Sequence, residues 1–190
     1  MRPHLVIFVK EPRPGRVKTR LGADIGLVPA AWWFRHQTRR LIRTMSRDPR
    51  WQTVIAVAPD RMGLESRFWP RHLPRHPQGN GNLGQRMARA LRMMPPGPAI
   101  IIGADIPGIT PAHVARAFDA LGAHDAVFGP APDGGYWLIG LKRTRAIQPT
   151  LFDGVRWSSE HALADSRATL RDHTIAEVAI LRDVDTAADL

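Results

Sequence analysis

Isolated aspartates follow short apolar segments at two places in the chain. Asp105 ends the run AIIIGAD, and Asp183 and Asp185 follow the run AEVAIL as part of DVD. A carboxylate at the end of a buried strand is costly unless it is paired or bound to a cation, and Mg²⁺ prefers one or two carboxylates together with phosphate oxygens and water. If DVD is extended, Asp183 and Asp185 point to the same side. The pattern favours a divalent-metal site, although Asp105 could instead cap the turn before Pro107.

Basic side chains gather in the segment KEPRPGRVKTRLG, directly after the apolar run HLVIFV. The chain has 24 arginines and three lysines, and two of the lysines are Lys10 and Lys18. Lys10, Lys18 and Arg20 could surround a di- or triphosphate, and Gly15 would let backbone N–H groups approach it. The spacing of a Walker A motif is absent. A surface loop that binds nothing is the alternative, but its place at the end of a strand favours phosphate binding.

A turn signal, DGG, joins two apolar runs in the segment GPAPDGGYW, which holds the only tyrosine of the chain. An ordinary hairpin is one interpretation. The other is an acceptor site formed by Asp133, Gly134, Gly135 and Tyr136, because the two glycines allow close approach of the backbone to a ligand.

Strand-like and helix-like runs alternate along the chain, which predicts a mostly parallel sheet covered by helices. We expect strands at 4–9, 52–58, 99–105, 125–131, 136–141 and 176–181, and helices at 29–46, 83–94, 110–122 and 158–173. Thr110 and Pro111 should begin the third of these helices and Gly122 should end it, while Thr186 and Asp189 fit a capping pattern for a final helix. Ligands in such sheets bind at the carboxyl ends of the strands, so the loops after residues 9, 58, 105 and 131 should form the site, together with the loop after 181 if that strand joins the sheet in parallel.

Length and composition fit one globular domain spanning residues 1–190, with 44% hydrophobic and 23% charged residues. The absence of cysteine excludes disulfides, thiolate metal sites and cysteine nucleophiles. No apolar run approaches the roughly 20 residues of a membrane helix, and LVIFV is too short for a signal peptide, so we expect a cytoplasmic protein without a membrane span.

The net charge of +10 attracts polyanions, and arginines form a row on the 29–46 helix. Nucleic-acid binding by this row is therefore one alternative function. Phe34 falls on the apolar face of the helix, so the basic face lacks the interleaved aromatic residues that bases stack on. We expect no specific nucleic-acid partner.

Several motifs in order, KEPRPGRVKTRLG, QGNGNLGQRM, IIIGADIPGIT, GPAPDGGYWLIGL, LFDGVRWSS and DVDTAADL, resemble a bacterial glycosyltransferase-like family of unassigned substrate. This family has the GT-A, or nucleotide-diphospho-sugar transferase, fold, and the resemblance covers nearly the whole chain. More distantly, the basic loop, GAD and DVDT are similar to phospholactate guanylyltransferases and molybdenum-cofactor nucleotidyltransferases. The resemblance implies a single-domain three-layer α/β/α structure. The implied site residues are Lys10, Gly15, Lys18 and Arg20 for the nucleotide, Asp105, Asp183 and Asp185 for Mg²⁺ or Mn²⁺, and the 133–137 hairpin for the acceptor.

The resemblance also implies a transferase that uses a nucleotide or nucleotide-sugar donor and a small-molecule acceptor. Negative charge would build on the leaving diphosphate or pyrophosphate, where the basic loop and a metal at Asp105 could neutralise it. Glycosyl transfer is favoured, because the full-length match rests on more residues than one charged loop.

Nucleotidyl transfer to a phosphorylated small acid, with release of pyrophosphate, is the alternative. Glycosyltransferases of this fold usually carry a D-x-D motif, whereas GADIP has one aspartate. A non-catalytic nucleotide-binding protein is a further alternative. Asp133 and Asp185 are both candidates for the general base, and the sequence leaves the nucleotide, the acceptor and the oligomeric state open.

Overall fold

A computed structural model describes residues 2–190, and this part of the chain forms a mixed seven-stranded sheet. The strands are β1 (His4–Lys10), β2 (Gln52–Ala58), β3 (Arg75–Pro77), β4 (Ala99–Ile102), β5 (Ala126–Pro130), β6 (Tyr136–Leu141) and β7 (Ile175–Glu177). They lie in the order β3-β2-β1-β4-β6-β5-β7. Four neighbouring pairs are parallel, and β6 is antiparallel to both β4 and β5. The predicted mostly parallel sheet is confirmed.

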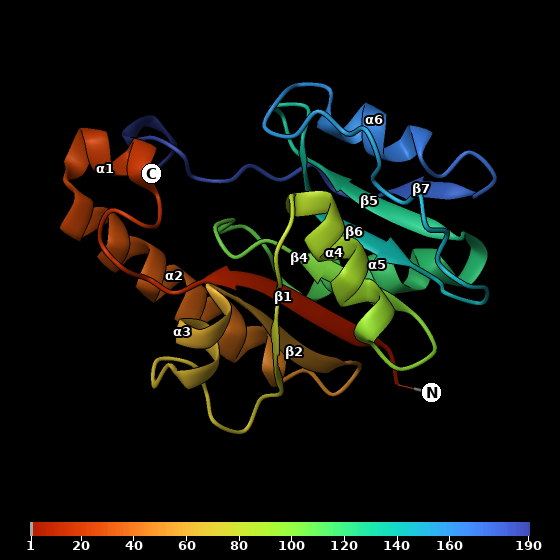
Figure 1. Cartoon of the computed structure of the whole chain (residues 1–190), viewed down its shortest axis with the longest axis horizontal. Coiled ribbons are helices and arrows are strands. Elements are labelled where there is room, and N and C mark those ends of the chain that lie inside the picture. The colour runs from red at the N-terminus through yellow and green to blue at the C-terminus, as the bar shows by residue number, and fades with distance from the viewer. Residues whose placement is uncertain (1) are drawn as a thin grey trace.

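Helices cover both faces of the sheet, which gives three α/β/α layers (Figure 1). The helices α2 (Leu27–Ser46) and α5 (Pro111–Ala123) pack on the face that receives Leu5 and Ile7 of β1. The helix α4 (Leu83–Met93) and the segment around α6 (Ala162–Ala168) pack on the face that receives Val6. Because side chains alternate along a strand and both faces are covered, β1 is apolar from Leu5 to Val9.

The remaining helices are short. They are α1 (Thr19–Ile25), α3 (Asp60–Glu65) and the 3₁₀ helix η1 (Ala187–Asp189). The predicted capping pattern at the last of these is confirmed, because the side chains of Thr186 and Asp189 cap η1 reciprocally. None of the helices within residues 2–190 is long and apolar enough to cross a bilayer.

Several predicted boundaries are wrong. β4 ends at Ile102 rather than at Asp105, and the helix expected at 158–173 is reduced to α6. The last strand stops at Glu177, although the N–H groups of Val178 and Leu181 still donate to carbonyls of the β5 strand. Gly122 does not end α5, which runs to Ala123 with His124 as its C-cap. Neither α1, α3 nor β3 was predicted.

The loops that were expected to bind a ligand lie along the side of the sheet where β1, β2 and β4 end, which we call the carboxyl edge. All strands except β6 run in the same direction, so the start of β6 lies at the same edge as the carboxyl ends of β1, β2 and β4. The tip of the β5–β6 hairpin therefore belongs to this edge.

The C-terminal segment leaves β7 and crosses this edge to reach α1 (Figure 1). The N–H of Val184 donates to the carbonyl of Asp105 at 3.2 Å, and the N–H of Ala187 donates to the carboxylate of Asp24 in α1 at 2.9 Å. The last residues thus connect the edge strand β7 with α1, the helix that follows the inner strand β1.

Candidate functional site

The three predicted metal ligands meet at the carboxyl edge, and we call Asp105, Asp183 and Asp185 the acidic cluster. Each offers a carboxylate oxygen, and these oxygens all lie within 4.8 Å of one another. Asp105 lies in the turn after β4, and the other two lie in the crossing segment after β7. Val184 between them is buried, and because side chains alternate in extended backbone, its burial turns Asp183 and Asp185 to the same side.

The ammonium of Lys18 lies among these carboxylates. Its Nζ is 2.6 Å from Oδ2 of Asp105, 2.8 Å from Oδ1 of Asp185 and 3.9 Å from Oδ2 of Asp183. The Lys18 side chain is only 7% exposed. Arg20 reaches Asp185 from outside at 3.0 Å with a side chain that is 71% exposed. The structure therefore pairs Lys18 and Arg20 with carboxylates, whereas the sequence predicted phosphate partners.

Charge and burial oppose one another in this cluster. Burial and the neighbouring charges of Asp185 and Asp105 raise the pKa of Asp183 to about 6. Burial would also raise the pKa of Asp185, but the hydrogen bond from Lys18 and the charge of Arg20 lower it below its ordinary value. Burial disfavours the charged form of Lys18, yet the surrounding carboxylates outweigh this effect and raise its pKa. The cluster thus stabilises a cation strongly.

The rest of the basic loop faces a different hollow. Lys10, Arg13 and Arg16 line a surface depression beside Pro59, at the carboxyl ends of β1 and β2. Gly15 has a positive φ of 73° in the turn between these side chains. Lys10 and Lys18 therefore belong to two neighbouring parts of the edge rather than to one cradle.

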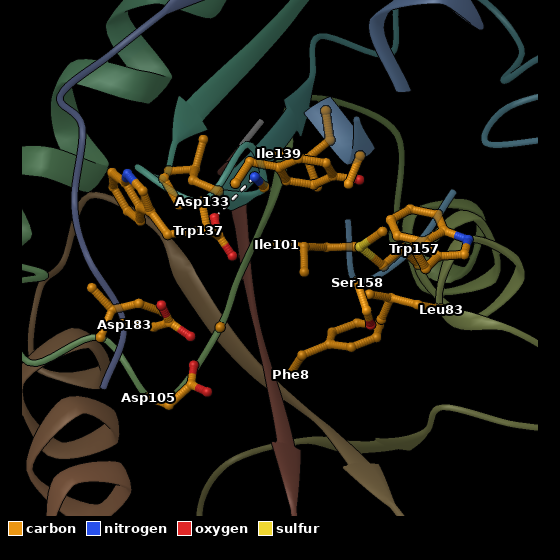
Figure 2. Close-up of a pocket in the computed structure, with 18 of the residues that line it drawn as sticks. Phe8, Leu83, Ile101, Asp105, Asp133, Trp137, Ile139, Trp157, Ser158 and Asp183 are labelled. Carbon is orange, nitrogen blue, oxygen red and sulfur yellow. Dashed lines mark hydrogen bonds between the residues drawn. The ribbon is translucent and has the colours of Figure 1, made fainter. Parts of the chain in front are cut away.

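A pocket of about 230 Å³ adjoins the acidic cluster. Asp105 and Asp183 lie at one end, and Phe8 and Trp157 lie across the pocket from them (Figure 2). Its remaining walls are mostly apolar and come from β4, β6 and α4. No lysine, arginine or histidine is among the described residues that line this pocket. Its charged groups are the carboxylates of Asp105, Asp133 and Asp183.

The tip of the β5–β6 hairpin supplies part of the wall. Asp133 Oδ1 accepts the N–H of Gly135 at 2.9 Å (Figure 2), and no residue within 2–190 donates a hydrogen bond to its second oxygen. Asp133, Gly135 and Tyr136 line the pocket, but Gly134 does not. A side chain at Gly134 would overlap the backbone of Glu160. The group that lies close to this glycine is therefore the backbone of Glu160, and not a ligand as the sequence suggested.

Tyr136 contributes its ring to the pocket. Its hydroxyl lies 3.1 Å from Oγ of Ser166 in α6, and burial raises the pKa of the phenol. The hydroxyl is therefore committed to an internal contact. Trp137 is likewise fixed, since its indole N–H donates to the carbonyl of Ala179 at 2.9 Å.

Sequence reasoning missed the side of the pocket opposite the acidic cluster. Trp157, Ser158 and Phe8 were given no chemistry, yet all three line the pocket. Gly84 in α4 offers a signal in retrospect, because a Cβ there would come within 2.7 Å of both Phe152 and Trp157. The motif LFDGVRWSS is thus packed against the start of α4 and closes the pocket.

The acidic cluster fits a divalent cation of the hard, oxygen-binding type. Three carboxylates from two segments converge, and an ammonium already lies within 2.8 Å of two of them. Mg²⁺ and Mn²⁺ favour carboxylate, phosphate and water oxygens over nitrogen or sulfur ligands. The residues of this chain can therefore hold the metal that the resemblance implies.

Residues 41–159 match the family model described as "Uncharacterized protein conserved in bacteria (DUF2064)". A crystal structure from Desulfovibrio desulfuricans G20, provisionally classed as a nucleotide-diphospho-sugar transferase, is 30% identical with a TM-score of 0.85. The alignment covers 97% of this chain and 83% of that one. No curated protein matches the chain.

More distant structures share the fold. The manganese complex of Rv0371C from Mycobacterium tuberculosis H37Rv is 18% identical with a TM-score of 0.58, covering 99% of this chain and 95% of that one. The inositol-1-phosphate CTP transferase of T. maritima is 12% identical with a TM-score of 0.63, covering 100% and 91%. The predicted GT-A-like fold is confirmed by these likenesses.

Proposed function

Because the chain belongs to the bacterial DUF2064 family and has the nucleotide-diphospho-sugar transferase fold, we propose that it is a metal-dependent transferase using a nucleotide-activated donor. The donor lies along the carboxyl edge of the sheet, with its phosphates toward the basic loop. Lys10, Arg13 and Arg16 line one hollow there and supply three positive charges. Gly15 and Arg20, from the same loop, flank the phosphates.

The acidic cluster holds Mg²⁺ or Mn²⁺ in this proposal. A divalent ion bound there supplies positive charge to the leaving diphosphate, where negative charge develops in the transition state. The manganese complex of the mycobacterial relative supports a divalent metal in this fold. Asp105 belongs both to the acidic cluster and to the wall of the pocket, so it connects the proposed metal site with the proposed acceptor site.

The charge of the pocket favours glycosyl transfer, and this observation carries the proposal. The described residues that line the pocket include three aspartates but no cationic side chain. Lys18 pairs with Asp105 and Asp183, but Asp133 has no ion-pair partner among the described residues, so a phosphorylated acid would meet its charge without a matching arginine or lysine, which is unfavourable. A neutral acceptor with a hydroxyl group meets aromatic walls and carboxylates that can accept its hydrogen bonds.

The reaction then needs one proton acceptor. The acceptor hydroxyl oxygen forms a bond to the anomeric carbon, and the bond between that carbon and the diphosphate oxygen breaks. The hydroxyl proton passes to a carboxylate, for which Asp133 is the best placed, because one of its oxygens is free of protein partners. The second product is a nucleoside diphosphate, or a monophosphate if the donor is a monophosphate sugar.

Nucleotidyl transfer is the second candidate, and the basic hollow favours it. Lys10, Arg13 and Arg16 outnumber Glu11, the one carboxylate that also lines this hollow, and the resulting positive charge suits a triphosphate. The fold is also that of a CTP transferase from T. maritima. In this reaction the acceptor attacks the α-phosphorus and pyrophosphate leaves.

Product analysis distinguishes the two candidates. The protein is incubated with Mg²⁺ and either nucleotide sugars or nucleoside triphosphates, together with neutral sugars or phosphorylated small acids. We expect release of nucleoside diphosphate from a nucleotide sugar when a neutral acceptor is present, and no pyrophosphate above background. Pyrophosphate that disappears in the Asp105→Asn variant would show nucleotidyl transfer on the same site.

A further inference from the structure

Lys18 differs from the other two lysines in its surroundings. Its side chain is 7% exposed and lies among three carboxylates, whereas Lys10 is exposed at the edge and Lys142 donates to the carbonyl of Gly122 at 2.7 Å. The partners of Lys18 are the same three residues whose oxygens could hold a metal ion. The ammonium therefore makes ion pairs with the oxygens that a divalent cation would need.

The backbone at Lys18 is unfavourable for a lysine. Its φ of 46° and ψ of 51° place it in the left-handed region, at the residue before α1, where its side chain caps nothing. In this conformation the Cβ of an L-residue comes too close to the following carbonyl oxygen, so residues other than glycine adopt it rarely. Local structure gives no reason for a lysine in place of a glycine at this position. The ion pairs with the acidic cluster are the contacts that a glycine would lose.

An ammonium and a divalent cation cannot share the same carboxylate oxygens at contact distance. Both are positively charged, and at contact distance in a partly buried site they repel each other strongly. If the metal binds, Lys18 must leave. The basic side of the edge, where the donor's phosphates lie in our proposal, offers the displaced ammonium new anionic partners.

We propose that Lys18 is a built-in competitor of the metal: it occupies the acidic cluster when no donor is bound, and it moves to the donor's phosphates when the metal enters. This inference rests on the proposed metal and donor site. It predicts that metal alone binds weakly and that donor and metal strengthen each other's binding, since coupling between two ligands is reciprocal. Lys18 would then prevent a metal from remaining in the site without a donor.

The first test measures Mn²⁺ binding by electron paramagnetic resonance, with no nucleotide present. The proteins are the wild type, Lys18→Met and the control Arg20→Met, which removes an exposed partner of Asp185. We expect Lys18→Met to bind Mn²⁺ at least about tenfold more tightly than the wild type, because one buried positive charge is gone. Arg20→Met should change the affinity by less than about threefold, because its charge is screened by solvent.

The second test needs no variant, because the chain has only three lysines. Ammonium groups of ¹⁵N-labelled lysine give an NMR signal when they are buried in ion pairs and protected from exchange with water. The Lys18 signal should be visible in the metal-free protein and should shift or vanish as Mg²⁺ saturates the site, while any Lys142 signal stays. A Lys18 signal that persists unchanged at saturating Mg²⁺ overturns the exchange.

The outcomes separate this inference from the proposed function. Equal Mn²⁺ affinity in the wild type and Lys18→Met overturns the competition but leaves a metal site in place. No Mn²⁺ binding to either protein overturns both the competition and the metal-dependent function. If Lys18→Met does not fold, as judged by its circular dichroism and thermal unfolding, the NMR measurement on the wild type decides alone.

Discussion

At the scale of single residues, glycines with similar backbone angles differ in what surrounds them. Gly134 has φ of 82° and Gly154 has φ of 71°. A Cβ on Gly134 would overlap the backbone of Glu160, whereas a Cβ on Gly154 would have nothing within 4 Å. The hairpin tip is therefore fixed by a close backbone approach, while the other position needs glycine only for its φ.

Alanine substitutions separate these two requirements. Gly154→Ala should lower the free energy of unfolding by about 1 kcal/mol, from the unfavourable φ alone. Gly134→Ala should lower it by more than about 3 kcal/mol, because backbone must also move. Gly122→Ala, inside α5 and with open space, should instead raise stability by about 0.5–1 kcal/mol. Urea unfolding measures all three, and equal losses at positions 134 and 154 would contradict the packing argument.

Asp105 allows a test of the metal site at the same scale. Asp105→Asn keeps the size of the side chain and removes its charge, and the backbone carbonyl that accepts from Val184 remains. We expect Mn²⁺ affinity to fall by at least about tenfold with little loss of stability. Isothermal titration gives the affinity, and Asp153→Asn, an exposed carboxylate outside the cluster, is the matched control. Unchanged Mn²⁺ binding in Asp105→Asn would remove this residue from the site.

Residue types and spacing could predict the acidic cluster but not the partner at its centre. Asp105, Asp183 and Asp185 follow apolar segments, which is a local pattern. The bond between Lys18 and Asp185 joins residues 167 positions apart, and no local pattern reports such a contact. Trp157 was missed for the same reason, because its place in the pocket depends on packing against Gly84.

At the scale of elements, hydrogen bonds between two side chains join the starts of the paired strands β5 and β7. Asp125 precedes β5 and Thr174 precedes β7. The carboxylate of Asp125 accepts the backbone N–H and the hydroxyl of Thr174, each at 2.9 Å. These hydrogen bonds hold the pKa of Asp125 below its ordinary value of 3.8.

The sign of the resulting pH dependence follows from this shift. The carboxyl group has a lower pKa in the folded than in the unfolded protein, so it stabilises the fold above about pH 4. That contribution is lost as the pH falls through the folded pKa. The stability difference between the wild type and Asp125→Asn should therefore be largest near pH 7 and shrink below pH 4. Chemical unfolding at several pH values measures it, and a constant difference down to pH 2.5 would contradict the assignment.

Apolar patterns in the sequence could predict the buried strands of the sheet, but not short helices that are stable only when packed against a neighbouring element. The strands at 52–58 and 136–141 were predicted with their observed limits, because their apolar runs end clearly, at Pro59 and at Lys142. α1 was not predicted, since a seven-residue helix is marginal by itself. It packs against α2, where the missing side chain of Gly22 makes room for Leu27.

At the scale of the whole molecule, the net charge of +10 should produce only weak attraction to nucleic acid. Two members of the arginine row of α2, Arg35 and Arg39, stack over Phe68 at 4.5 and 5.3 Å. Phe68 is also packed against the core, so its ring is not free to stack with bases. Phe68 therefore offers no stacking surface for bases beside these two arginines.

Fluorescence anisotropy with labelled duplexes tests this expectation. Affinity should be similar for unrelated sequences and should fall steeply between about 50 and 200 mM salt, because it depends on counterion release. Tight, sequence-dependent binding at physiological salt would instead support a nucleic-acid function.

The crossing of the C-terminal segment has a consequence for synthesis on the ribosome. Residues 1–177 include every strand of the sheet, but Asp183 and Asp185 are translated after all of them. A nascent chain that has exposed the whole sheet still lacks Asp183 and Asp185, which are two of the three carboxylates and two of the three ion-pair partners of Lys18. The cation site therefore cannot form during translation of the sheet. A prematurely terminated product ending near residue 180 would have every strand of the sheet but neither Asp183 nor Asp185 of the acidic cluster.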